Sequence, residues 1–365
     1  MVWVEFVAEW RVTRCGGSDK SFAIRTVSVM SDTNGNIRIF AGESSKPFAE
    51  RMCKYLGLTM GKSFSKRFGD GNTYVRFDES ARNEDVFIVQ AIGRDPNNEF
   101  MELLFWVDAF RRSSANSITA IIPYYGYAKA DKKDEPRVSI RGRVCADCLE
   151  AEGVDRVICM DLHAPQVQGF FKVPVDHLYA RPLLCAYANR AGLVTEDSVV
   201  VSPDAGFAKN ARLFADQLGL SLAICNKVRY GHDEKAKVME IIGEVKGKTC
   251  LVVDDFTTSG GTIVDVAHNL MDKGANKVCA FLSHAIVNEA AVRKIEDSPL
   301  TQLIVTDTVD CPDIAQYSTK IKVISAAPLF AEAVKTIHDR KPMADMFANL
   351  PDPLIYASLA DQLKL

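Results

Sequence analysis

The stretch CLVVDDFTTSGGTIVDVAHNL, residues 250–270, decides the fold of this chain. It opens with a continuous apolar run that ends in two acids, Asp254 and Asp255. A turn rich in hydroxyl residues and glycine follows, and an amphipathic run begins where the turn ends. Continuous apolar strands belong to sheets that are covered on both faces. The pattern therefore predicts a buried parallel strand, a tight turn and a helix, which is the repeating unit of α/β folds.

The turn in this stretch is suited to binding an anion. Unpaired backbone N–H groups point outward at the start of a helix, and the helix dipole favours negative charge there. Gly260 and Gly261 let the backbone approach a phosphate closely, and Ser259 and Thr262 add hydroxyl donors. Acids at the end of a strand suit sugar hydroxyls or a metal. The alternative is a tight turn with an ordinary helix cap; the spacing matches neither a Walker A loop nor G-x-G-x-x-G.

The same alternation extends outward over most of the chain. Short β-branched runs alternate with longer amphipathic ones, which favours α/β with mostly parallel sheets flanked by helices. Strands are predicted at 37–40, 86–90, 118–123, 156–161, 199–203, 222–226, 250–255, 277–284, 302–307 and 321–324. Helices are predicted at 47–56, 100–112, 143–152, 183–190, 206–218 and 262–273.

A faint internal repeat predicts the domain organisation. The strand, helix and strand of 86–123 resemble those of 250–284, and both helices end near a turn of small residues. Two copies of one unit account for two domains of similar size in a chain of 365 residues. The predicted divisions are an extension at 1–35, a first domain at 36–180, a second at 181–340 and a terminal segment at 341–365.

Charge and composition exclude several classes of protein. The net charge is −3, so no excess of basic charge offers a surface to nucleic acid. The sequence contains no run of 18 uncharged apolar residues, so no membrane span is predicted. The ten cysteines are scattered and mostly lie in apolar strands, which favours buried thiols in a reducing compartment and hence the cytoplasm. The pair Cys145 and Cys148 is predicted to pack within a helix, and the terminal Leu-Lys-Leu is a poor match to a peroxisomal address.

Other segments give the chain a recognisable family. FGDGNTYVRFDES (68–80), IPYYGYAKADKKDEPR (122–137), MDLHAPQVQGFF (160–171), VDHLYA (175–180) and VSPDAGFAKNAR (201–212) occur in this order with the 250–270 loop. Together they resemble ribose-phosphate diphosphokinase, the phosphoribosyl pyrophosphate (PRPP) synthetase family. The resemblance covers roughly 36–350 and implies two similar phosphoribosyltransferase-type domains. It also implies transfer of the diphosphoryl group of Mg-ATP to the 1-hydroxyl of ribose 5-phosphate, with release of AMP.

The resemblance assigns roles to single residues. Lys227 and Arg229 would be the catalytic cations, on a mobile loop that follows the strand ending at Asn226. The metal of Mg-ATP would be held by His163 and Asp204, with Asp161 beside them; the alternative for His163 is a structural histidine, and for the basic loop a solvated one. The implied ATP-contacting residues are Phe68, Asp70, Gly71, Asn72, Lys129, Ala130, Asp131, Lys133 and Asp134. The implied ribose 5-phosphate residues are Asp254, Asp255, Thr258, Ser259, Gly260, Gly261 and Thr262.

The family's assembly and regulation enter as expectations too. The loop at Phe68 reaches a neighbouring subunit in the family, which implies a dimer-based homo-oligomer, with a hexamer as one form, and a shared ATP site. An allosteric phosphate and ADP site is matched by Ser80, Arg82, Gln168 and Asp176. Pro165, Pro342 and Ala344 stand where serines are common in the family. Because hydroxyl donors to phosphate are lost there, we expect weakened dependence on phosphate.

Several departures from the family pattern keep other readings open. Thr258 replaces a usual aspartate in the ribose loop, as in the plant-type class II enzymes that accept donors besides ATP. Asn72 replaces a usual glutamate, Asn210 an arginine, and Lys129-Ala130 an Arg-Gln pair. Lysine keeps the charge of arginine but loses its bidentate fork. One alternative is therefore a weak or silent regulatory subunit of such an enzyme; another is a phosphoribosyltransferase that consumes PRPP.

Overall fold

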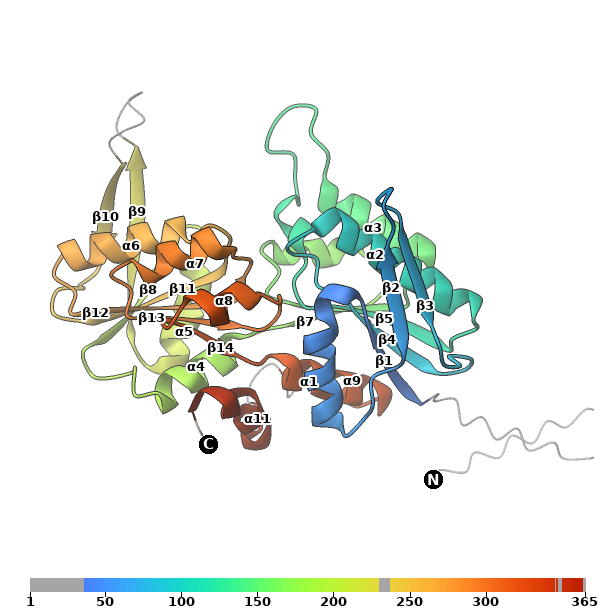
Figure 1. The fold of residues 1–365 in the computed structure, drawn as a ribbon. Helices are drawn as coiled ribbons and strands as arrows, with labels where there is room; N and C mark the ends of the chain where they lie inside the picture. The colour runs from blue at the N-terminus through green and yellow to red at the C-terminus, as the bar shows by residue number, and fades with distance from the viewer. Residues whose placement is uncertain (1–35, 230–236, 345, 347–349, 364–365) are drawn as a thin grey trace, which may run out of the picture. The chain divides into compact units, whose positions relative to one another are not determined.

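A computed structural model describes residues 36–229, 237–344, 346 and 350–363. The predicted extension at 1–35 lies outside the described residues, as do 230–236. The described residues belong to one compact unit (Figure 1). None of their helices is long and apolar enough to cross a membrane.

Two parallel sheets carry the fold, as the alternating pattern predicts. The first has five parallel strands in the order β1 (Ile37–Ala41), β4 (Asp85–Val89), β5 (Ser117–Ile122), β6 (Arg156–Met160) and β7 (Val175–Leu178). The second has seven, in the order β10 (Lys237–Ile242), β9 (Ser221–Arg229), β8 (Ser198–Ser202), β11 (Thr249–Thr257), β12 (Lys277–Ala285), β13 (Gln302–Thr306) and β14 (Ile321–Ile324). Only β10 runs antiparallel to its neighbour in this sheet. A separate antiparallel hairpin joins β2 (Ser63–Arg67) and β3 (Thr73–Phe77).

Helices connect the strands and cover both faces of each sheet. They are α1 (Lys46–Leu56), α2 (Pro96–Arg112), α3 (Arg141–Glu152), α4 (Arg181–Arg190), α5 (Ala208–Leu218), α6 (Gly261–Asp272), α7 (Glu289–Glu296), α8 (Pro312–Tyr317), α9 (Ala327–His338) and α11 (Asp352–Leu363). Short 3₁₀ turns occur at η1 (Glu43–Ser45), η2 (Gly126–Lys129) and η3 (Pro165–Phe170). Cys145 and Cys148 lie within α3, as predicted, and no cysteine of the described residues forms a disulfide.

Every strand and helix predicted from the sequence is present, and four strands were missed. The missed strands are β2, β3, β7 and β10. The predicted end of the strand at 222–226 is wrong, because this strand, β9, continues to Arg229. Backbone pairing with β10 supports the extra residues, with Lys227 opposite Met239 and Arg229 opposite Lys237.

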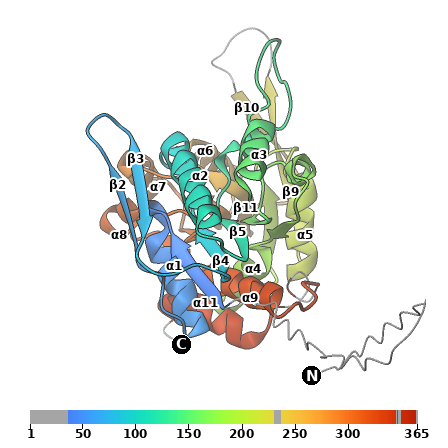
Figure 2. The same cartoon turned by 90° about the vertical axis from the view of Figure 1, so that its right-hand side faces the viewer.

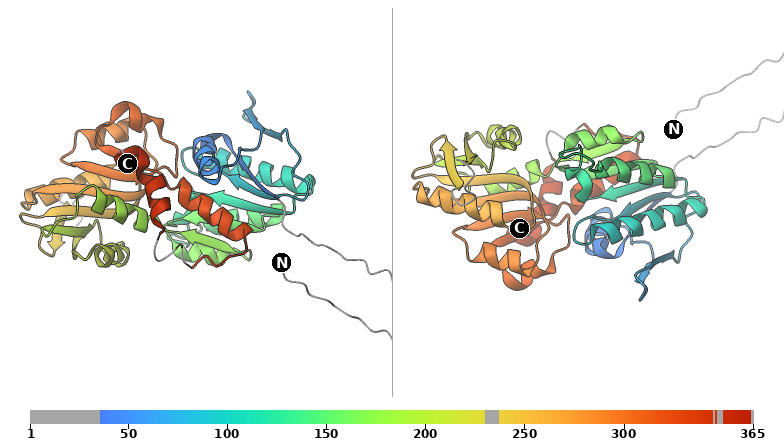
Figure 3. Two further views of the ribbon diagram at one scale, coloured as in Figure 1. Left: turned by 90° about the horizontal axis from the view of Figure 1, so that it is seen from below. Right: turned by 90° about the horizontal axis from the view of Figure 1, so that it is seen from above.

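Alternate residues of each strand enter different hydrophobic cores. Phe40, Ile88 and Ile122 point to the face of the first sheet that α2 and α3 cover. The opposite face of that sheet and one face of the second sheet share a single core, to which α1, α4, α5 and α9 contribute. The other face of the second sheet packs against α6 and α7. The views from below and above show α9 beside α1, although the two helices lie far apart in the sequence (Figure 3).

The packing of α9 bears on the predicted domains. Phe330 of α9 meets Phe48 of α1 edge to face, with ring centroids 5.4 Å apart. A helix from the second predicted domain thus covers the sheet of the first. The boundary near 180 stays a prediction, and the core on either side of it is continuous.

The internal repeat has a structural counterpart. In both units a helix joins two neighbouring parallel strands, β4 to β5 through α2 and β11 to β12 through α6. An asparagine precedes the second strand in each, and its backbone N–H donates to a carbonyl just before the first strand. These bonds are Asn116 to Glu84 and Asn276 to Lys248, both 2.9 Å long.

Replacing Phe110 with alanine should destabilise the protein strongly. Its ring is fully buried, with centroids 4.7 Å from those of both Phe40 and Phe77 and 5.8 Å from that of Trp106. We expect Phe110→Ala to lower the free energy of unfolding by about 3–5 kcal/mol, because a cavity remains. Met101→Ala is the matched control, since Met101 lies on the same helix with 43% of its surface exposed. Urea unfolding measures both, and equal effects would contradict this account of the core.

Candidate active site

The central contact of the site joins the two sheets at the carboxyl ends of their strands. His163 lies in the loop after β6, and its Nδ1 is 2.6 Å from Oδ2 of Asp255 in β11. Asp255 is buried, whereas about half of the His163 side chain is exposed. Because Nδ1 is engaged by the carboxylate, Nε2 is the nitrogen available to a ligand. Ligands of parallel α/β sheets bind at this edge.

Two neighbouring acids give the site its electrostatic character. Burial, and then the charge of Asp255, raise the pKa of Asp254 well above its usual range. The hydrogen bond to Asp255 raises the pKa of His163 and thus favours its charged form. Asp254 and Asp255 are therefore two adjacent acids in a site with little exposure to solvent. Such a pair is stabilised when cations or hydroxyl donors approach it.

Asp161 ties the same loop to the second sheet. Its carboxylate accepts from Ser283 Oγ of β12 at 2.5 Å and from the backbone N–H of Ala180 at 2.9 Å. Burial raises the pKa of Asp161 to about 6, and the two hydrogen bonds oppose that rise. His284 adds a bond, from Nε2 to the carbonyl oxygen of Met160 at 3.1 Å. The end of β6 is thus bonded to β11 and β12 at three positions.

Lys129 brings a positive charge to these acids. It ends the turn η2, and its Nζ lies 3.5 Å from the ring centroid of Phe256 in β11. Burial lowers the pKa of Lys129, and the nearby Asp255 opposes this change. Ala130 is buried beside it, and Asp131 accepts from the amide of Gln166. Lys133 and Asp134 lie farther along, on an exposed loop.

A cavity of about 780 Å³ opens beside these groups. Of the residues predicted from the sequence, it brings together Asp161, His163, Asp254 and Asp255. Its wall also contains Tyr179, Arg181, Lys209 and Asn210. Asp204 lies close by, since its charge reaches Asp254, and its exposed carboxylate accepts from the N–H of Phe207 at 2.9 Å.

The glycine loop turns sharply from the end of β11 into α6. Gly260 caps α6 with a φ of +70°, and a Cβ there would lie 2.9 Å from Cγ1 of Ile295. Only glycine fits such a left-handed position without strain. Its N–H contacts the hydroxyl of Thr257 at 3.1 Å, and the N–H of Gly261 contacts that of Ser259 at 3.3 Å. The side chains of Thr258, Ser259 and Thr262 are exposed to an incoming ligand.

Sequence reasoning missed two residues at the site. Nζ of Lys294, in α7, lies 3.4 Å from the position that a Cβ on Gly261 would take. It therefore sets a cation at the mouth of the cradle. Phe256 contacts both Lys129 and His163. The sequence holds no pattern that points to Lys294; Phe256 stands next to the acid pair, but an apolar residue in a strand reads as core.

The other predicted residues lie apart from this centre. Phe68, Asp70, Gly71 and Asn72 form the exposed turn between β2 and β3, and Phe68 is 44% exposed. Its ring centroid lies 6.2 Å from that of Tyr74. Figure 2 shows this hairpin on the side of the protein opposite β9 and β10. Lys227 and Arg229 lie at the end of β9; their side chains, and residues 230–236, are outside what the structure describes.

The predicted allosteric residues lie in two separate places. Ser80 Oγ accepts from the N–H of Arg82 at 3.4 Å, in the loop after β3. Asp176 of β7 forms an ion pair with Arg156 at 2.6 Å. Gln168 contacts the buried ring of His177 at 3.2 Å. Gln168 and Asp176 therefore lie at or beside β7, at one end of the first sheet, whereas Ser80 and Arg82 lie in the loop between β3 and β4.

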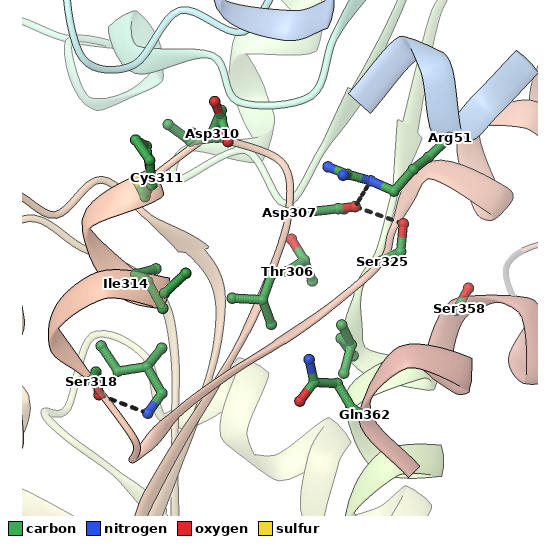
Figure 4. A pocket seen from close by; sticks show the side chains of 16 residues that line it. Arg51, Thr306, Asp307, Asp310, Cys311, Ile314, Ser318, Ser325, Ser358 and Gln362 are labelled. Atoms are coloured by element: carbon green, nitrogen blue, oxygen red, sulfur yellow. Dashed lines mark hydrogen bonds and ion pairs between the residues drawn. The ribbon is translucent and has the colours of Figure 1, made fainter. Parts of the chain in front are cut away.

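A second cavity of about 370 Å³ contains none of the predicted residues. The buried carboxylate of Asp307 stands at its side, bonded to Arg51 Nε at 2.8 Å and to Ser325 Oγ at 2.6 Å (Figure 4). Ser358 and Gln362 of α11 form another part of its wall. These contacts join α1, the end of β13 and α11, so this cavity marks a structural junction.

The fold and the candidate site define an α/β protein with a cluster of charged residues at the carboxyl ends of its parallel strands. Comparison with known families narrows this class. The N-terminal domain of ribose phosphate pyrophosphokinase matches residues 37–153, and the phosphoribosyl synthetase-associated domain matches 230–348. The chain belongs to the ribose-phosphate pyrophosphokinase family.

The matches to individual relatives span nearly the whole length of each relative. A ribose-phosphate pyrophosphokinase of Caldanaerobacter subterraneus is 42% identical over 318 residues, which is 87% of this chain and 100% of the relative. That of Rhizobium meliloti is 41% identical over 85% of this chain and 100% of its own. The crystal structure of phosphoribosylpyrophosphate synthetase from Mycobacterium smegmatis superposes with a TM-score of 0.78 at 36% identity, covering 84% of this chain and 99% of that one.

Removing the Ser283 hydroxyl should weaken the joint between β6 and β12. Ser283→Ala leaves the buried Asp161 carboxylate short of a donor, so we expect a loss of about 1–3 kcal/mol in unfolding free energy. Ser221→Ala, at an exposed position of the same sheet, is the control. Denaturant unfolding at neutral pH compares the two. If Ser283→Ala is as stable as the control, the bond does not hold the loop.

Proposed function

We propose that the protein transfers the diphosphoryl group of Mg-ATP to the 1-hydroxyl of ribose 5-phosphate, giving 5-phosphoribosyl 1-pyrophosphate and AMP. The 2.6 Å contact between His163 and Asp255 carries this proposal. It sets a ligand nitrogen from one sheet beside the acids and glycine loop of the other. Family membership and a nucleotide-sized cavity at the same edge support it.

Ribose 5-phosphate belongs in the glycine loop. Its phosphate is received by the N–H groups and hydroxyls of Thr258, Ser259 and Thr262 at the start of α6, where the helix dipole adds to the attraction. Lys294 adds a cation at the same mouth. Asp254 and Asp255 accept hydrogen bonds from the sugar hydroxyls. The 1-hydroxyl then faces the nucleotide, held in line for attack on the β-phosphorus.

Mg²⁺ fits the residues present only as part of a nucleotide complex. Among the described residues no three His, Cys, Asp or Glu side chains are grouped to hold a metal. Mg²⁺ takes few protein oxygens and leaves the rest of its shell to phosphates and water. The exposed Asp204 carboxylate and Nε2 of His163 suit that role. Asp161 is the weaker candidate, because Ser283 and Ala180 already bond its carboxylate.

The diphosphoryl group is stabilised by positive charge from several elements. Lys129 meets the triphosphate from η2, with Ala130, Asp131, Lys133 and Asp134 along the same segment. Lys227 and Arg229 supply two further cations from the end of β9. Negative charge on the transferring oxygens is spread in the transition state, so cations placed there lower the barrier. The bound Mg²⁺ supplies further charge neutralisation.

The β2–β3 hairpin supports a shared site. Its turn, with Phe68, Asp70, Gly71 and Asn72, is exposed and lies on the side opposite β9 and β10. An adenine contacted by this turn must therefore belong to another subunit, which favours a dimer-based homo-oligomer. The absence of disulfides among the described cysteines supports a reducing compartment such as the cytoplasm.

Ribose-dependent release of AMP tests the activity. We expect AMP from Mg-ATP only when ribose 5-phosphate is present, and a loss of about 100-fold or more in Lys227→Ala, because one charge-stabilising group is removed. Lys172→Ala, an exposed lysine outside the site, is the control. A folded protein that binds ATP but releases no AMP would instead favour the silent regulatory subunit, for which Thr258 in place of an acid is the main sequence argument.

Activity should also depend little on inorganic phosphate. Pro165, Pro342 and Ala344 lack the hydroxyls that would donate to phosphate at the allosteric site. Initial rates measured in phosphate-free buffer and with added phosphate should therefore be similar. The double variant Pro342→Ser, Ala344→Ser should gain activation by phosphate. Strict phosphate dependence of the unaltered protein would contradict this expectation.

A further inference from the structure

Phe256 occupies a position between the two halves of the site. It follows Asp255 in β11 and is partly buried against the core of the second sheet. One neighbour is the Lys129 ammonium, 3.5 Å from its ring centroid. Another is the His163 ring, whose centroid is 5.5 Å away at an interplanar angle of 78°. The Tyr124 ring lies 6.4 Å away on the core side.

The contact with Lys129 is electrostatic as well as apolar. The face of an aromatic ring carries partial negative charge, so an ammonium this close to the centroid is attracted even at an exposed position. Lys129 is exposed, and its side chain makes no ion pair within 4.0 Å in the part of the chain described. The ring face of Phe256 therefore lies close to the Lys129 ammonium and attracts it, while the carboxylate of Asp255 acts on the same ammonium from farther away.

The contact with His163 has a different geometry, and it also restrains the side chain that it touches. An edge-to-face arrangement limits how far an imidazole ring can rotate, and such pairs prefer this geometry. Asp255 holds Nδ1 of the same ring. Two contacts from consecutive residues, Asp255 and Phe256, therefore fix its orientation. One aromatic side chain restrains a cation and a ligand histidine that come from separate loops of the first sheet.

We propose that Phe256 is a positioning residue, whose ring face holds the Lys129 ammonium, and whose edge-to-face contact holds His163, where the triphosphate of the nucleotide binds. The inference rests on the proposed function for the identity of the nucleotide. An aliphatic residue of similar size fills the same volume but has no charged ring face. Substitution should therefore affect nucleotide binding much more than stability or turnover.

The test separates the effect of the side chain's shape from the effect of the negative charge on its ring face. Phe256→Leu removes the ring, Phe256→Tyr keeps it, and site-specific replacement by a trifluorinated phenylalanine keeps the shape while weakening the negative face. We expect about a fivefold higher KM for Mg-ATP in Phe256→Leu, with kcat and the KM for ribose 5-phosphate little changed. The fluorinated protein should show an intermediate KM, and Phe256→Tyr should be close to the unaltered protein.

A second background separates positioning from packing. In Lys129→Met, which removes the charge and keeps the chain length, Phe256→Leu should raise the KM for Mg-ATP much less, because the partner cation is gone. Equal increases in both backgrounds, or a fluorinated protein that matches the unaltered one, would overturn the proposal. The fluorinated variant decides the question if Phe256→Leu fails to fold.

Calorimetric binding of Mg-ATP keeps the two proposals distinguishable. If the unaltered protein binds Mg-ATP but releases no AMP, the proposed activity fails, and the same series of variants is compared by Kd in place of KM. A protein that neither binds nor turns over the nucleotide overturns both. Ribose-dependent AMP with no effect of the ring in either KM or Kd overturns only the role of Phe256.

Discussion

The end of strand β6 and the loop after it are hydrogen-bonded to the second sheet at three positions, and the site depends on these bonds. Met160 accepts from His284, Asp161 from Ser283, and His163 contacts Asp255. Each bond joins a strand end of one sheet to β11 or β12 of the other. The carboxyl edges of two separate parallel sheets thereby become one surface. Neither sheet alone has a ligand histidine, an acid pair and an anion cradle within reach of one another.

The acids and the lysine on this surface do not neutralise one another fully. Asp254 is partly buried beside Asp255, and its pKa is raised first by burial and then by the charge of Asp255. On the other side, Lys129 is held against a ring rather than against a carboxylate. Under the proposed function, a nucleotide that carries both phosphates and Mg²⁺ would satisfy acids and cations together, so its binding would relieve a cost that the folded protein already carries.

Much of the fold could be predicted because its strands are buried on both faces and therefore read as continuous apolar runs. The missed strands β2 and β3 contain no buried residue, and no continuous apolar run marks them. β10 was missed and β9 was ended too early because the end of β9 and the whole of β10 are supported by pairing with each other, which no local sequence pattern reveals. At the site, the strand-end acids and glycines were visible from the sequence. Lys294 and Phe256 were not, because their roles depend on packing between elements that are distant in the chain.

The position of α9 has a consequence for synthesis on the ribosome. The face of the first sheet that carries α1 is completed only by α9, through contacts such as that of Phe330 with Phe48. Nearly three hundred residues separate β1 from α9. A nascent chain that has emerged only as far as β7 must therefore expose an apolar surface until the second sheet and α9 follow. The shared core therefore forms only after the later half of the chain has been made, and the first half is the part exposed to aggregation in the meantime.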